Sequence, residues 1–239
     1  MRILAIADVE EKLLWGSFNR RRFEGIDLIL AAGDLAPDYL EFLVTMLNRP
    51  LLYVHGNHDD KFRKSAPGGC ICLDGSVYVY QGIRIAGLAG SRKYRDGKYM
   101  YTEREMARQI RRIDPQIRLL GGLDILLTHA PERGVGDLED LPHQGFECFD
   151  EFVERWHPRY HIHGHVHANY IPDFKRERVL ASGTHVINAY GYTTIDVPPA
   201  SQLSYGWRES WVNRRCLKKS DGLTAQEAGV LGAGYMYFG

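Results

Sequence analysis

The sequence of 239 residues has no excess of charge of either sign. Its 30 lysines and arginines balance 30 aspartates and glutamates, so net charge does not draw the chain to a membrane surface or to nucleic acid. Short basic runs at 20–22 and 111–112 still allow a local basic patch. We therefore expect no membrane partner and regard nucleic acid as a possible but not a favoured partner.

Long apolar runs are also missing. No stretch approaches the roughly 20 apolar residues that cross a bilayer, and the apolar run at the N-terminus meets Asp8 too early for a secretory leader. The four cysteines are too few for a disulfide scaffold, and a chain of this size does not need one. These features predict a cytoplasmic protein with reduced thiols.

Three short apolar runs in the first third of the chain predict parallel strands buried on both faces. They lie at 3–7, 28–32 and 51–54, with a helical pattern between the last two. Polar residues follow each run directly, namely Asp8, Asp34, Asn57 and His58. Because ligands bind beyond the carboxyl ends of such strands, we expect these side chains to converge.

The rest of the chain predicts an α/β protein with a second sheet. Apolar patterns favour a hairpin at 77–88, helices at 102–113 and 146–156, a buried strand at 124–128 that ends in His129, and second-sheet strands near 179–181, 185–187 and 192–197. We treat residues 1–197 as one domain and 198–239 as an appendage of unknown role. The tryptophans and aromatic residues of that appendage leave a homo-oligomer possible.

An alternating histidine run lies at 161–168 and holds four of the chain's ten histidines. Alternation is typical of a strand, but Gly164 interrupts it. Clustered imidazoles have little structural use, because each needs a partner when buried, whereas they serve well as metal ligands. We expect His165 and His167 to be ligands and His161 and His163 to support them.

The candidate metal ligands combine carboxylate, amide and imidazole groups. They are Asp8, Glu10, Asp34, Asn57, His58, His129, His165 and His167. A carboxylate can bridge two ions, and such a mixture suits two divalent cations, most of all Mn, with Fe, Zn, Ni or Co as alternatives.

Five ordered motifs resemble those of the calcineurin-like metallophosphoesterases, in particular the small bacterial phosphodiesterase-type branch. They stand at 8–10, 33–34, 56–59, 128–129 and 164–167. The resemblance implies a four-layer α/β/β/α sandwich with a dinuclear metal site at the strand ends. It also implies a cytoplasmic hydrolase that cleaves a phosphodiester or a small phosphorylated metabolite.

The resemblance also implies a role for each matching residue. One metal would bind Asp8, Asp34 and His167, and the other would bind Asp34, Asn57, His129 and His165, so that Asp34 bridges the two. His58 would face the scissile ester as a general acid or charge stabiliser. Two such ions lower the pKa of a bound water and supply the hydroxide that attacks phosphorus.

Two positions depart from the family pattern. Glu10 stands where the family usually has histidine; as a ligand it would make the site less positive and favour harder ions such as Mn²⁺. Alternatively Glu10 does not ligate, and the first metal is weakly held. Pro37 stands where a second aspartate belongs, so the partner of His58 could instead be Asp59.

The basic and aromatic segment 90–101 and a polar loop at 137–143 offer substrate contacts. From these segments we select Arg92, Tyr94 and His143. Two alternatives to the phosphoesterase remain open. One is a non-catalytic metal- or nucleotide-binding protein of the same fold, and the other is a nuclease.

Overall fold

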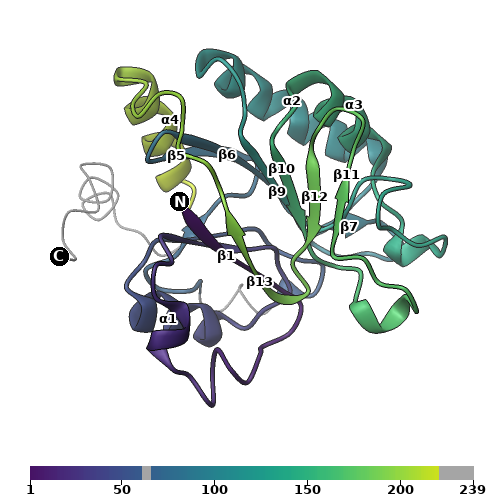
Figure 1. Ribbon diagram of the computed structural model, residues 1–239. Coiled ribbons are helices and arrows are strands. Elements are labelled where there is room, and N and C mark those ends of the chain that lie inside the picture. The colour runs from purple at the N-terminus through teal and green to yellow at the C-terminus, as the bar shows by residue number, and fades with distance from the viewer. Residues whose placement is uncertain (61–65, 221–239) are drawn as a thin grey trace.

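Two β-sheets lie face to face between layers of helices in the computed structural model, which describes residues 1–60 and 66–220 (Figure 1). In the first sheet the strand order is β13-β1-β2-β3-β4. Its strands are β1 (Arg2–Ala7), β2 (Leu28–Ala31), β3 (Leu51–Tyr53), β4 (Ile71–Cys72) and β13 (Gly191–Asp196). β1 to β4 are parallel, and the three predicted apolar strands are confirmed as β1, β2 and β3.

The second sheet has the order β11-β12-β10-β9-β6-β5. Its strands are β5 (Ser76–Tyr80), β6 (Ile83–Leu88), β9 (Ile125–Thr128), β10 (Tyr160–His163), β11 (Glu177–Val179) and β12 (His185–Asn188). β5 and β6 form the predicted hairpin, in which Gln81 and Gly82 adopt positive φ values of 47° and 78°. A smaller sheet pairs β7 (Ser91–Arg92) with β8 (Met100–Tyr101).

Three hydrophobic cores separate four layers of secondary structure. Alternate residues of β1 face different cores: Ile3 and Ala5 pack against the second sheet, whereas Leu4 and Ile6 pack towards helix α1 (Pro37–Leu47) and the short helix η1 (Arg20–Phe23). The third core lies between the second sheet and helices α2 (Glu103–Leu119) and α3 (Glu147–Trp156). The four-layer α/β/β/α sandwich is therefore confirmed.

Helix α2 begins at the predicted capping box. The hydroxyl of Thr102 accepts a hydrogen bond from the Glu105 amide, and the Glu105 carboxylate accepts one from the Thr102 amide. Two backbone amides at this helix end, those of Thr102 and Glu105, thus have hydrogen-bond partners. Within residues 1–60 and 66–220, no helix is long and apolar enough to cross a membrane.

Helix α4 (Trp207–Leu217) covers the edge strand β5. The side-chain amide of Asn213 accepts a hydrogen bond from the Val79 amide at 2.8 Å and donates one to the Val79 carbonyl at 2.9 Å. Cys216 and Leu217 are buried in the core between the sheets. This helix falls in the predicted appendage; the boundary at residue 197 stays a prediction, and residues 221–239 lie outside the described part of the chain.

One strand assignment from the sequence was wrong. The run at 192–197 was expected in the second sheet, but it forms β13, which pairs antiparallel with β1 in the first sheet, with Ile195 opposite Ile3. The apolar alternation marks a strand with a buried face. It does not specify the sheet, because both sheets face the same central core.

Candidate metal centre

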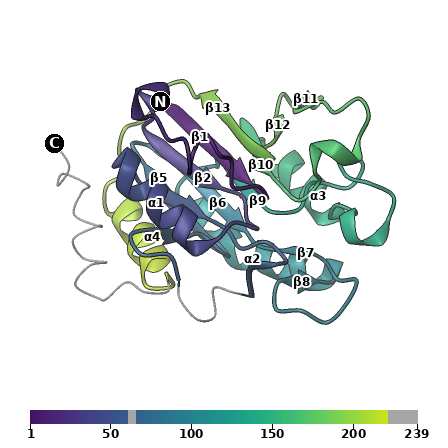
Figure 2. The same cartoon turned by 90° about the horizontal axis from the view of Figure 1, so that it is seen from below.

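The predicted ligands meet where the strands of both sheets end. Asp8 follows β1, Asp34 lies just beyond β2, His129 follows β9 and His165 lies just beyond β10. Figure 2 shows β1 ending beside β9 and β10. Parallel strands bring residues that are far apart in sequence to one edge, so the site combines both sheets.

Three of these residues occupy the left-handed region of backbone conformation. Asp8 has a φ of 65°, Asp34 of 59° and His165 of 69°. Residues with a Cβ avoid this region, and such geometry is concentrated at functional sites, where the surrounding structure maintains it. Here it turns the chain sharply at the end of each strand, and the side chain of each residue lies among the other ligands.

Asp34, His129 and His165 form the tightest group. One ligand atom from each lies within 4.8 Å of the others. Nδ1 of His129 lies 2.7 Å from the carbonyl oxygen of Ala32, which can only accept, so Nδ1 carries the hydrogen. Nε2 then faces Oδ1 of Asn57 at 2.9 Å and Oδ2 of Asp34 at 3.4 Å. Three lone-pair atoms therefore converge, which requires a proton or a cation between them.

His165 is oriented in the same way. Its Nε2 donates to the carbonyl of Pro142 at 2.7 Å, which leaves Nδ1 with the lone pair that a metal needs. Burial lowers the pKa of His165 well below its ordinary value, so the ring is neutral. Both buried histidines thus have a nitrogen available to a metal, and the donor set fits divalent ions.

The carboxylates carry the negative charge of the site. Burial would raise the pKa of Asp34, but His129 and the amide of His58 hold it below its ordinary value. Burial alone would lower the pKa of His129, but Asp34 and Asp8 raise it to about 9. Burial also raises the pKa of Asp8 to about 7. A divalent cation would offset the effect of burial on the carboxylates, because it favours their ionised form, and like burial it favours the neutral imidazole of His129.

Asp8 lies next to the other predicted ligand of the first metal. Its Oδ1 is 3.9 Å from Nε2 of His167. The ring of His167 stacks on Tyr170, with centroids 4.8 Å apart, and tilts against Tyr190. The short helix η4 (Ala168–Tyr170) brings Tyr170 to this position. Sequence reasoning missed both tyrosines, because a single aromatic residue in an irregular segment has no periodic signal.

Glu10 lies on the outer side of this region. Its side chain is exposed, and Oε1 accepts a hydrogen bond at 3.1 Å from the amide of Ala36, the N-cap of α1. The carboxylate therefore satisfies a helix-terminal amide, and its second oxygen stays available. That Glu10 binds the first metal remains a prediction.

His58 lies at the edge of the site and is exposed. Its backbone amide, not its ring, donates to Oδ1 of Asp34 at 2.8 Å. The neighbouring Asp59 is buried, and its Oδ2 accepts from the amides of Asp34 and Gly56 at 2.9 and 2.8 Å. Asp59 thus ties together the loops that follow β2 and β3.

Two of the three predicted substrate contacts lie beside the ligands. The hydroxyl of Tyr94 accepts a hydrogen bond from the side-chain amide of Asn57 at 3.4 Å. The ring of His143, in helix η3 (Leu141–His143), lies 5.3 Å from that of His165, and its Nδ1 lies 2.6 Å from the carboxylate of Asp140.

Arg92 has a different environment. Its guanidinium pairs with the carboxylate of Glu103 on α2 and lies over the ring of Phe146 at 5.7 Å. The same carboxylate accepts from the amide of Cys148 at 2.7 Å, so this network links β7 to α2 and α3. A substrate contact by Arg92 stays a prediction.

The first two histidines of the alternating run are buried behind the ligands. His161 lies between Oε1 of Glu132 at 2.9 Å and the hydroxyl of Thr128 at 2.8 Å, and His163 donates to the carbonyl of Gly164 at 2.9 Å. Glu132 is fully buried. Nothing in the sequence marked it as the partner of His161.

A second group lies beyond β3 and β4. His55, Cys72 and Asp74 place one potential ligand atom each within 4.8 Å, and Nδ1 of His55 is 2.5 Å from Oδ2 of Asp74. The ring of His55 stacks on Tyr99 with centroids 4.3 Å apart. A nitrogen–oxygen separation this short is that of a direct hydrogen bond, which makes the pair part of the packing beside the metal centre.

Residues 1–169 match the sequence profile of the calcineurin-like phosphoesterases. The chain therefore belongs to this family, which comprises metal-dependent hydrolases of phosphoric esters. No curated protein sequence matches the chain.

The fold has solved counterparts. It is similar to the protein TT1561 of Thermus thermophilus, with a TM-score of 0.53 and 14% identity over 82% of this chain and 99% of that one. A Vps29 mutant from Entamoeba histolytica (TM-score 0.43, 14% identity, 83% and 87% coverage) and a metallophosphoesterase from Sphaerobacter thermophilus (0.34, 15%, 98% and 99%) are weaker likenesses. The first of these similarities supports the fold and no particular substrate.

Proposed function

We propose that the protein hydrolyses a phosphodiester or a small phosphorylated metabolite at a centre of two divalent ions, with Mn²⁺ as the favoured metal. The observation that carries the proposal is the convergence of the Asp34, His129 and His165 ligand atoms within 4.8 Å, next to a buried Asp8. The ions, when bound, attract the anionic phosphate and activate a water molecule for attack on phosphorus.

The ligands divide into two sets. Asn57, His129 and His165 surround one position beside Asp34, whereas Asp8 and His167, 3.9 Å apart, adjoin a second. Asp34 would serve both sets. Glu10 would complete the second set if its carboxylate leaves the amide of Ala36, and its oxygen donor is the reason for favouring a hard ion such as Mn²⁺.

His58 is proposed to protonate the leaving alkoxide. His58 is exposed at the edge of the site. The hydrogen bond from its backbone amide to Asp34 fixes the backbone beside the ligands. A positioned general acid of this kind contributes about 10²–10⁴-fold to the rate. The proton moves from the imidazole to the leaving oxygen as the phosphorus–oxygen bond breaks.

Aromatic side chains at the entrance would contact the rest of the substrate. Tyr94 lies beside Asn57, while the ring centroids of His143 and Tyr170 lie 5.2 Å apart, next to His165 and His167 respectively. Tyr170 is 46% exposed. Such groups suit an ester whose leaving group has a flat or apolar part.

The direct test is hydrolysis of bis-p-nitrophenyl phosphate and p-nitrophenyl phosphate by protein reconstituted with Mn²⁺, with the metal content measured on the same sample. We expect two ions per chain and turnover that is lost in Asp34→Ala. Absence of turnover with each of Mn, Ni, Co, Fe and Zn would exclude a phosphoesterase. One ion or none, together with tight nucleotide binding, would indicate a non-catalytic binding protein, and cleavage of DNA would indicate a nuclease.

A cytoplasmic location is part of the proposal. All four cysteines have free thiols, of which Cys70, Cys72 and Cys216 are buried. Burial raises the pKa of Cys70 to about 12, so this thiol is unreactive. Free thiols are typical of a reducing compartment.

The possible homo-oligomer is a separate part of the proposal. Sedimentation of the purified chain would test it.

A further inference from the structure

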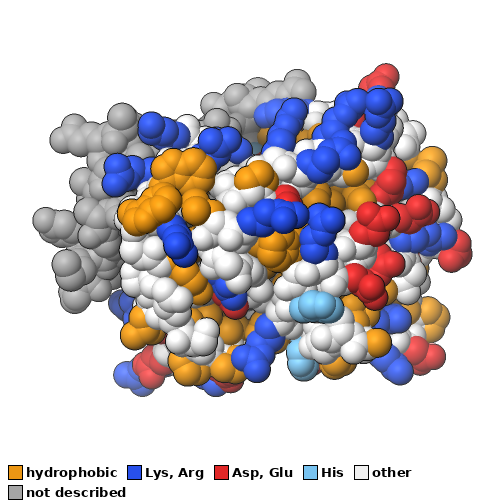
Figure 3. All heavy atoms as spheres, turned by 90° about the horizontal axis from the view of Figure 1, so that it is seen from above, with side chains coloured by type: hydrophobic (Ala, Val, Ile, Leu, Met, Phe, Trp, Pro, Cys, Tyr) orange, Lys and Arg blue, Asp and Glu red, His pale blue; other side chains and the backbone are white. Residues whose placement is uncertain are grey.

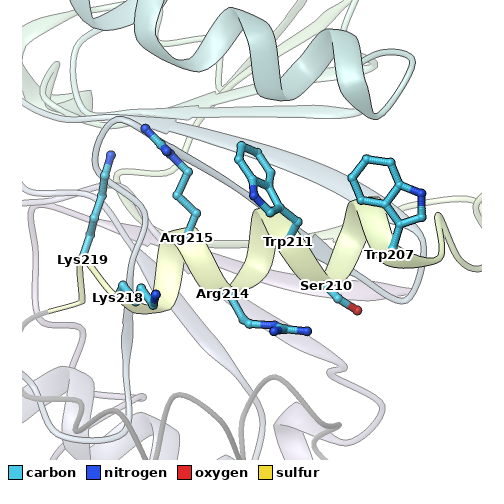
Figure 4. A pocket seen from close by; sticks show the side chains of 7 residues that line it. All are labelled: Trp207, Ser210, Trp211, Arg214, Arg215, Lys218 and Lys219. Carbon is cyan, nitrogen blue, oxygen red and sulfur yellow. The ribbon is translucent and has the colours of Figure 1, made fainter.

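The outer face of α4 carries a groove that the metal centre does not use. The groove has a volume of about 740 Å³ and is lined by Trp207, Trp211, Arg214, Arg215, Lys218 and Lys219, together with Ser210 (Figure 4). In Figure 4 the side chains of Trp207, Trp211, Arg215 and Lys219 extend from the same side of the helix, and Arg214 and Ser210 extend from the other. Two indoles therefore occupy the first half of the helix, and the cations occupy the second half.

The two indole rings are open to solvent. Trp207 is 68% exposed and Trp211 is 47% exposed, although the inner face of the same helix is tightly packed by Val212 and Cys216. Tryptophan rings on a folded surface are costly to leave in water unless they have a partner. Flat, exposed rings one turn apart are suited to stacking against other flat groups.

The cations of the groove are Arg214, Arg215, Lys218 and Lys219. Within residues 1–60 and 66–220, Arg214, Arg215 and Lys218 form no ion pair. Arg215 lies over the ring of Trp211 at 5.7 Å, and Lys219 donates only to the carbonyl of Gly75, at 2.8 Å. These four positive charges lie within residues 214–219 and repel one another, so an anion at this position would be bound favourably.

Helix α2 extends the same positive surface. Arg111 and Arg112, one of the basic runs noted in the sequence, are exposed on α2. Burial and the neighbouring charges of Arg215 and Arg112 lower the pKa of Lys219, so α2 and α4 contribute to one electrostatic environment. Figure 3 shows Lys and Arg side chains spread over this side of the molecule beside a hydrophobic patch, with most Asp and Glu side chains in view on the other side. The neutral net charge of the chain conceals this separation.

We propose that this groove binds single-stranded nucleic acid, with phosphates on Arg214, Arg215 and Lys218 and bases stacked on Trp207 and Trp211. A group of cations next to exposed aromatic rings is suited to hold unpaired strands, because the cations bind the backbone and every base has a face that can stack. Arginine in particular matches the geometry of phosphate oxygens. The proposal concerns a surface separate from the metal ligands and does not depend on the proposed hydrolysis.

An anionic bilayer is the alternative ligand, because it is negatively charged like a nucleic-acid backbone. It requires an outward-facing apolar stripe along the helix. On α4 the apolar stripe faces the protein core, and of the large apolar side chains of the helix only Trp207 and Trp211 are exposed. Two rings one turn apart offer a bilayer little apolar surface, whereas they can stack against the bases of a flexible strand.

The experiment is fluorescence anisotropy of a labelled oligothymidylate of about 20 nucleotides, a length that exceeds the usual site size, titrated with the full chain in EDTA. EDTA prevents hydrolysis and removes binding through the metals, so the result is independent of the proposed function. We expect binding at about 50 mM salt that weakens steeply by about 200 mM. Trp207→Ala and Trp211→Ala should each weaken binding about tenfold, while Trp207→Phe retains most of it.

A matched pair of variants tests the cations. Arg214→Ala with Arg215→Ala should lower the slope of log affinity against log salt by about 1.4, the value for two lost phosphate contacts on a single strand. Arg21→Ala with Arg22→Ala removes the same charge from the exposed surface of η1 and should leave the slope unchanged. Circular dichroism confirms that each variant is folded, and hydrolysis of bis-p-nitrophenyl phosphate should be unaltered in both.

Three results would overturn the proposal. They are no anisotropy change at about 50 mM salt, the condition that favours electrostatic binding most, equal losses in the α4 and η1 variants, and cosedimentation with phosphatidylserine vesicles by a chain that ignores the oligonucleotide. The last result would identify the groove as a membrane contact instead.

Discussion

The backbone amide of His165 donates to both carboxylate oxygens of Asp8, at 3.0 and 2.9 Å, across 157 residues of sequence. Asp8 follows β1 of the first sheet, and His165 lies just beyond β10 of the second. One carboxylate therefore fixes the loop that carries two predicted ligands, and the site depends on how the two sheets are packed.

Replacement of His58 separates proton transfer from metal binding. In His58→Ala the amide that binds Asp34 is retained, so we expect an unchanged metal content and a loss of kcat of about 10²–10⁴-fold. The loss should be greater for a phenyl ester than for a p-nitrophenyl ester, because the poorer leaving group depends more on a proton. Equal losses for both esters would contradict a general acid.

Gly56 leaves room for the carboxylate of Asp34. A Cβ at this position would lie 2.1 Å from Oδ1 of Asp34, so Gly56→Ala should displace Asp34 and abolish binding of at least one metal. Gly16→Ala is the control, because a Cβ there meets nothing within 4 Å. Metal analysis after dialysis measures the difference, and full occupancy in Gly56→Ala would show that Asp34 is not a ligand.

Glu10 is expected to set the preference for metals. Glu10→His replaces an oxygen donor by a nitrogen donor, so affinity for Zn²⁺ relative to Mn²⁺ should rise by about tenfold or more. Calorimetric titration with each metal measures the ratio. An unchanged ratio, combined with a lower thermal midpoint, would mean that Glu10 only satisfies the amide of Ala36 at the start of α1.

Acid should destabilise the fold through His163. Burial, followed by the nearby His161, lowers the pKa of this ring to about 3. The unfolded chain binds a proton near pH 6.5, so the stability contributed by the neutral ring is present above that pH and is lost as the pH falls towards 3. In His163→Asn, which can still donate to Gly164, acid unfolding should begin at lower pH. His157→Asn, at an exposed left-handed C-cap, should leave the acid transition unchanged.

Replacement of Arg92 should change mainly stability, whereas replacement of Tyr94 should change mainly KM. Arg92→Ala leaves Glu103 without its guanidinium partner and should lower stability by about 1–3 kcal/mol with little effect on KM. Tyr94→Phe removes only the hydroxyl beside Asn57 and should raise KM without changing the thermal midpoint. A large rise in KM for Arg92→Ala would instead support its predicted substrate contact.

The sequence predicted those parts of the site that follow directly from strand ends. Asp34 and His129 come at or just after buried apolar runs, and parallel strands have only one edge at which such residues meet. His165 was identified through the interruption at Gly164, where a Cβ would lie 2.6 Å from that of Ala7. The convergence of these residues was therefore predictable from local pattern and topology.

Long-range side-chain partners could not be predicted in this way. Glu132 pairs with His161, and Arg92 pairs with Glu103, because separate elements pack together in three dimensions. The helical periodicity of Trp207 and Trp211 was visible, but the contact of Asn213 with the edge of β5 was not. Such contacts follow from tertiary packing, of which spacing along the chain carries no record.

The pairing of β1 with β13 has a consequence for folding during synthesis of the protein. Residues 2–7 are synthesised well before their antiparallel neighbours, which are residues 191–196. A fragment cut at residue 169, where the family match ends, would expose one edge of β1 and invite other chains to pair with it. The nascent chain must therefore keep this strand from aggregating until residues 191–196 are made, and the fold around the metal centre is not separable from the segment that contains β13.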